Sequence, residues 1–188
     1  MNHRSDQEEK RVLVALFAIN LLMFIFEFMV GLMIDSTALV ADSLDMLADS
    51  TVYVISLSAV GRSIYDKKRA AFLSGAFQVV LGTAVLADIV RRIVVGSHPD
   101  PLFMVAVGLC ALVANTLSVY IIYKHRKGEV HMRASWIFSR NDVIANIGVI
   151  AAGIFVFLLG SRWPDLVIGL VISAIVIRGG IGIMKDAR

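Results

Sequence analysis

The chain has 188 residues, of which 58% are apolar and 18% are charged, and its mean hydropathy is +0.80. Soluble domains average about 45–50% apolar and about 25% charged residues. The composition therefore indicates an integral membrane protein. The net charge of +3 is small and no basic stretch carries interleaved aromatic residues, so we expect no nucleic-acid partner. The single cysteine, Cys110, excludes an intramolecular disulfide, and we expect it to be a small core residue.

The apolar residues gather in six blocks, each long enough for a helix that crosses a bilayer, which needs roughly 20 residues. In chain order the blocks are Val12–Met33, Thr37–Val60, Ala71–Val95, Leu102–Tyr123, Ala134–Leu159 and Pro164–Met184. They are continuous, which excludes the alternating segments of a transmembrane β-barrel. We predict an all-α integral membrane protein with a six-transmembrane-helix bundle. It forms a single domain over 1–188, with tails at 1–11 and 185–188.

Lysine and arginine concentrate at alternate breaks between these blocks. The opposite breaks hold only Arg162. By the positive-inside rule, both termini are expected to be cytoplasmic. The basic residues of the predicted cytoplasmic breaks are Arg4, Lys10, Arg11, Arg62, Lys67, Lys68, Arg69, Lys124, Arg126, Lys127, Arg133, Lys185 and Arg188.

Polar residues near the opposite ends of the blocks predict two local features. Asp35, Ser36 and Thr37 offer an N-cap for the second predicted helix. Asp88 lies three and four residues before Arg91 and Arg92, and we expect an ion pair at the membrane interface.

Three aspartates lie inside the second block, at Asp42, Asp45 and Asp49. With 100° per residue in a helix, the three side chains share one face. Each acid at a helix centre costs about 2.5–3.5 kcal/mol by insertion scales. Three like charges on one face also repel one another unless protons or a cation neutralise them. The spacing therefore favours a metal site.

The fifth block contributes a fourth acid, Asp142. At about 1.5 Å per residue, Asp45 and Asp49 lie about 12 and about 18 Å from the outer end of their helix. Asp142 lies about 12–18 Å from the inner end of its helix, depending on where that helix begins. The carboxylates of the two helices can therefore meet around a divalent cation. The structural alternative is a set of protonated or hydrogen-bonded acids.

The stretch from Ser36 to Asp49, STALVADSLDMLAD, resembles the second-helix signature of the cation diffusion facilitator family of metal–proton antiporters. In that family the helix carries His/Asp-X-X-X-Asp, which Asp45 and Asp49 match. The stretch from Met132 to Ile150 resembles the fifth helix, where Asp142 matches an acidic ligand, and the sixth block is also similar. The resemblance covers all six predicted helices. It implies a metal site formed by Asp45, Asp49 and Asp142.

The chain departs from that family pattern at Phe138, four residues before Asp142, where the family has His or Asp. A phenyl ring cannot ligate a cation, so the resemblance implies only three side-chain ligands in this chain. Family members usually continue into a cytoplasmic metal-binding domain, and we expect no C-terminal cytoplasmic domain in this chain. Further cavity or ligand positions are expected among Asp42, Ser139, Asn146 and Glu27.

The resemblance implies a divalent transition-metal cation efflux transporter, with zinc exchanged for protons by alternating access. Cadmium, cobalt, manganese and iron are further expected cargo. The metal is substrate, and we expect neither a prosthetic group nor an enzymatic activity. The expected location is the cell membrane, as a multi-pass protein of the bacterial inner membrane.

The sequence leaves two alternatives to a transport function. One is a metal-binding accessory membrane protein that does not itself transport, which the missing ligand at Phe138 favours. The other is an intramembrane aspartyl hydrolase. The sequence contains no Gly-X-Gly-Asp stretch, which disfavours this function.

Small residues in the third and sixth blocks permit close approach of helices in a bilayer. We expect a homodimer through these transmembrane helices. The residues are Gly75, Gly82, Gly169, Ser173, Gly179, Gly180 and Gly182.

Overall fold

The computed structural model describes residues 3–58, 64–126 and 130–187. Over these ranges the chain is helical and contains no strand. The elements are α1 (His3–Met33), α2 (Thr37–Ser58), α3 (Ile64–Val95), α4 (Pro101–Ile122), the short 3₁₀ helix η1 (Tyr123–His125), α5 (Val130–Leu159) and α6 (Trp163–Asp186). The helices agree with the predicted blocks, and the last two residues of the second block lie outside the described ranges.

Five of the helices are long and apolar enough to cross a membrane, as judged on the described residues. They comprise Gln7–Met33, Ala71–Val95, Pro101–His125, Ser135–Leu159 and Trp163–Asp186. Helix α2 is not among them, and it carries three aspartates in 22 residues. Its role as a sixth span therefore stays a prediction.

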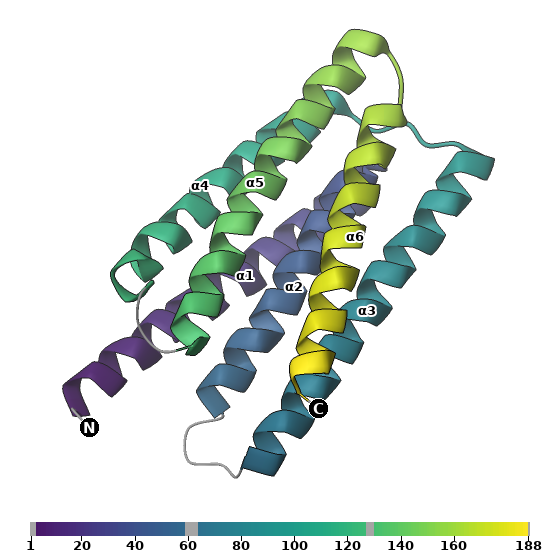
Figure 1. The fold of residues 1–188 in the computed structure, drawn as a ribbon. Coiled ribbons are helices and arrows are strands. Elements are labelled where there is room, and N and C mark those ends of the chain that lie inside the picture. The colour runs from purple at the N-terminus through teal and green to yellow at the C-terminus, as the bar shows by residue number, and fades with distance from the viewer. Residues whose placement is uncertain (1–2, 59–63, 127–129, 188) are drawn as a thin grey trace.

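Helix α2 lies in the middle of the bundle and packs against α1, α3, α5 and α6 (Figure 1). The most extensive helix pairs are α3 with α6, α4 with α5, and α1 with α2. The two ends of the chain lie at the same end of the bundle (Figure 1). That arrangement agrees with termini on one side of the membrane, and the cytoplasmic assignment of that side stays a prediction.

Apolar side chains fill the bundle interior and also cover much of its outside. The main core cluster joins residues of α2–α6, among them Leu39, Val85, Met104, Val149 and Ile172. Large apolar side chains are exposed on every helix, which is expected of a bundle surrounded by lipid. The prediction for Cys110 is wrong, because its side chain is exposed on α4.

The small residues that we assigned to a dimer interface pack inside one chain. A Cβ atom at Gly75 would lie 2.5 Å from the carbonyl oxygen of Gly180, and one at Gly82 would lie 2.5 Å from Ile177. Gly169 is packed in the same way against Thr37 of α2. These glycines therefore bring α6 close to α3 and α2, so their assignment to a dimer interface is wrong. Two other members, Gly179 and Gly182, have open or ordinary surroundings.

Candidate metal centre

Asp45 and Asp49 of α2 and Asp142 of α5 line one small cavity, as their spacing and depth predict. Its volume is about 70 Å³. Roughly 10–15 Å³ of such volume holds one water, so the cavity has room for a cation with several waters. The remaining lining residues are Gln78 of α3, Phe138 and Asn141 of α5, and Ile175, Val176 and Gly179 of α6.

The two deepest acids of this cavity are buried without full hydrogen bonding. Asp49 and Asp142 are 3% and 2% exposed, and the Oδ2 atom of each has no hydrogen-bond partner among the described residues. A buried carboxylate oxygen without a partner is costly unless a cation or a proton offsets it. As the side chains stand, no three His, Cys, Asp or Glu residues of the described ranges form a group that could hold a metal ion.

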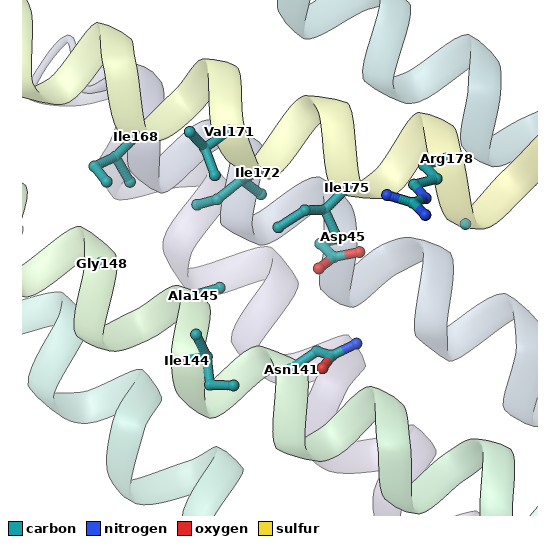
Figure 2. A pocket seen from close by; sticks show the side chains of 11 residues that line it. Asp45, Asn141, Ile144, Ala145, Gly148, Ile168, Val171, Ile172, Ile175 and Arg178 are labelled. Atoms are coloured by element: carbon teal, nitrogen blue, oxygen red, sulfur yellow. The ribbon is translucent and has the colours of Figure 1, made fainter.

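Asp45 also lines a second and larger cavity of about 740 Å³ between α5 and α6. Apart from Asp45, Asn141 and Arg178, the wall of this cavity is apolar. Figure 2 shows Asp45 and Asn141 on opposite helices, with Arg178 beyond them on α6. Asp45 is half-buried, so it is the acid at the boundary between the two cavities.

Phe138 and Gln78 also line the small cavity, one as an apolar and one as a polar side chain. Phe138 lies in the wall beside Asp142, which confirms that the two residues share one helical face. Gln78 is buried on α3, and sequence reasoning missed it. The available signal was a single amide in an otherwise apolar stretch.

None of the four additional positions named from the sequence lines the small cavity. The hydroxyl of Ser139 lies 3.4 Å from that of Tyr53. Asn146 donates to Asp42 at 2.5 Å, and Asp42 lies within hydrogen-bonding reach of Glu27. Polar atoms of Ser139, Asn146 and Asp42 are therefore used in contacts outside the small cavity. The neutral oxygen ligands available in its wall are those of Gln78 and Asn141.

The end of the bundle opposite the termini is closed by a polar network. Asp165 of α6 accepts the Ser36 hydroxyl at 2.7 Å, and accepts backbone N–H groups at the start of α2. Arg92 is 2% exposed and pairs with Asp88 and Asp35, each at 2.5 Å. The Asp88 ion pair is thus confirmed, but Arg92 is buried and reaches the α1–α2 turn.

Comparisons with known proteins show the family of this chain. The model of the cation efflux transmembrane domain matches residues 13–188. The chain belongs to the cation efflux family. The resemblance seen in the second and fifth helices is therefore confirmed, and this family member is a multi-pass membrane protein of a family of transporters.

Curated relatives of this cation efflux protein are similar over nearly its whole length. It is 24% identical to the "Cadmium, cobalt and zinc/H(+)-K(+) antiporter" of Bacillus subtilis, over 99% of this chain and 64% of the relative. It is 25% identical to the "Zinc transporter ZitB" of Yersinia pseudotuberculosis, over 97% of this chain and 62% of the relative. It is 25% identical to the "Metal cation efflux system protein CzcD" of Cupriavidus metallidurans, over 92% of this chain and 58% of the relative. The chain thus spans about three fifths of the length of these relatives.

Proposed function

We propose that this chain exports a divalent transition-metal cation, zinc first, from the bacterial cytoplasm in exchange for protons. The observation that carries the proposal is that Asp49 and Asp142 come from different helices and place unpartnered carboxylate oxygens near one cavity with Asp45. The names of the relatives support zinc, cadmium and cobalt as cargo.

The ligands of the proposed site are Asp45, Asp49 and Asp142. A divalent cation between them offsets the repulsion among the three carboxylates and draws their oxygens together. Zinc accepts carboxylate oxygen but prefers four ligands with nitrogen or sulfur among them. Since Phe138 supplies no ligand, water or an amide oxygen of Gln78 or Asn141 completes the shell.

Exchange follows because metal binding requires deprotonated carboxylates. The cation binds when the site opens to the cytoplasm and displaces protons from the aspartates. The bundle then opens at the other end, where protons bind the same carboxylate oxygens and displace the cation. The two well-packed helix pairs, α3 with α6 and α4 with α5, are the units that move in this alternating access.

A metal-binding accessory protein that does not transport is the second candidate function. The side chains as they stand form no complete metal group in the described ranges, and Phe138 leaves the shell short of one ligand. Both observations favour a weak metal site, which is the basis of this second candidate.

Proteoliposomes with a pH-sensitive dye inside separate the two functions. We expect Zn²⁺ addition to drive proton flux in the wild type, and Asp49→Asn or Asp142→Asn to abolish it while the protein still inserts. Asp186→Asn is the matched control, since this carboxylate is exposed at the end of α6. Metal binding without proton flux in the wild type would establish the accessory function.

We also propose a homodimer within the bilayer. Gly182 of α6 is half-buried and has nothing within 4 Å of a Cβ atom, so it remains a small residue that a second chain can approach. Cysteine cross-linking at position 182 in native membranes tests the dimer, and recovery of monomer alone would contradict it.

A further inference from the structure

Glu27 of α1 is a buried acid that the proposed metal site does not use. Its side chain is 0% exposed, and neither carboxylate oxygen has a hydrogen-bond donor among the described residues. No cationic side chain in that part of the chain pairs with it. An ionised carboxylate in these surroundings carries a large desolvation cost with nothing to offset it.

The carboxylate of Glu27 lies within hydrogen-bonding reach of that of Asp42 on α2. Asp42 is itself 1% exposed. Two buried carboxyl groups in hydrogen-bonding contact cannot both be ionised without a counter-charge, so one proton lies between them. The contact between these two side chains therefore depends on a bound proton.

The surrounding hydrogen bonds determine which of the two acids carries that proton. Asn115 of α4 donates to the side-chain oxygen of Asn146 at 2.9 Å. The amide nitrogen of Asn146 then donates to Oδ2 of Asp42 at 2.5 Å. Asn115 thus orients the Asn146 amide, and the Asn146 donor favours Asp42 as the charged acceptor. The proton is left on Glu27.

Two further titratable groups lie near the pair, Cys110 of α4 and Asp142 of α5. A bound divalent cation favours ionisation of every nearby acid.

We propose that Glu27 is a proton-carrying site of the transporter, separate from the metal ligands, which holds one proton without metal and releases it when the cation binds. This inference rests on the metal–proton exchange proposed above. The O–H bond of Glu27 breaks as one forms on Asp42. The O–H bond of Asp42 then breaks as the proton passes to water that enters from the cavity lined by Asp45. Asp42 lies three residues before Asp45 on the same face of α2, so the route leads from α1 to that cavity. The bound cation offsets the charge left on the pair.

Infrared difference spectroscopy tests this without any substitution. The chain has four glutamates, at Glu8, Glu9, Glu27 and Glu129. With ¹³C-labelled glutamate in the whole protein, we expect a label-sensitive carbonyl band of a neutral carboxylic acid at neutral pH, because solvated glutamates are ionised there. Zn²⁺ should remove that band. A band that persists with Zn²⁺ bound, or no label-sensitive band, would overturn the assignment.

A second measurement counts protons directly. Zinc calorimetry in buffers of different ionisation enthalpy gives the protons released per ion bound, and we expect Glu27→Gln to release about one fewer than the wild type. Glutamine keeps the volume and can donate to Asp42, while Glu27→Asp retains an ionisable group and should restore the release. An unchanged count in folded Glu27→Gln contradicts the proposal while leaving the metal function intact. A wild type that does not exchange zinc for protons overturns the proposed function and the role of Glu27 with it.

Discussion

Asp165 of α6 caps helix α2 at Thr37, accepting the backbone N–H of that residue at 2.7 Å through Oδ2. The other carboxylate oxygen accepts the N–H of Ala38 at 2.9 Å and the hydroxyl of Ser36 at 2.7 Å. The residues come from opposite ends of the chain, and all are buried. The acid satisfies N–H groups that a helix start leaves without partners, and negative charge is favourable there. It thereby fixes α2, which carries the proposed ligands, to α6.

Asp165→Ala should lower the free energy of unfolding by about 2 kcal/mol, the range for losing a cap and hydrogen bonds to a charged group. Thermal unfolding in detergent measures this. Asp186→Asn, at the exposed end of the same helix, should leave the midpoint unchanged. Equal stability of Asp165→Ala and the wild type would show that the capping bonds contribute nothing.

Arg92 and Arg91 form a matched pair for testing the closed end of the bundle. Arg92 is 2% exposed and bridges Asp88 to Asp35, whereas Arg91 is 56% exposed and contacts Asp88 alone. Arg92→Ala should cost about 2 kcal/mol through lost charged hydrogen bonds. Arg91→Ala should cost less than about 1 kcal/mol, as surface ion pairs do. Chemical denaturation of both variants checks this, and equal losses would contradict it.

Gly75→Ala tests the close contact between α3 and α6. The added methyl group would lie 2.5 Å from the carbonyl oxygen of Gly180, so the helices must move apart, at a cost of about 1–3 kcal/mol. Gly182→Ala is the control, since nothing lies within 4 Å of a Cβ atom there. The measurement is thermal stability in detergent. Equal stability of the two variants would contradict tight packing at Gly75.

Phe138→His tests the proposed ligand shell, which lacks one side-chain ligand. The ring lies in the wall of the cavity that holds Asp49 and Asp142, so an imidazole there adds the nitrogen donor that zinc prefers. We expect tighter Zn²⁺ binding and better discrimination against Mn²⁺, whose preferred donors are oxygens. Calorimetry in detergent gives both affinities. Unchanged affinities in a folded variant would show that position 138 does not reach the ion.

The sequence by itself determined the helices and the acids of the proposed site. Apolar blocks of membrane length set the elements because each helix satisfies its own backbone hydrogen bonds in lipid. The spacing of Asp45 and Asp49 and the position of Asp142 predicted a similar depth in the bundle for all three, because the rise and rotation per residue of a helix are fixed. The structure brings the three to one cavity.

The tertiary structure decided which helices meet and which polar groups become partners. The sequence does not distinguish whether Gly75 and Gly82 pack within one chain or between two chains. Only the fold shows that they approach α6 of the same chain. The spacing of Asp88 and Arg92 is local and was predictable, but the contact of Arg92 with Asp35 joins distant segments. The pairing of Glu27 with Asp42 likewise depends on the rotation of α1 against α2, which many neighbouring side chains determine together.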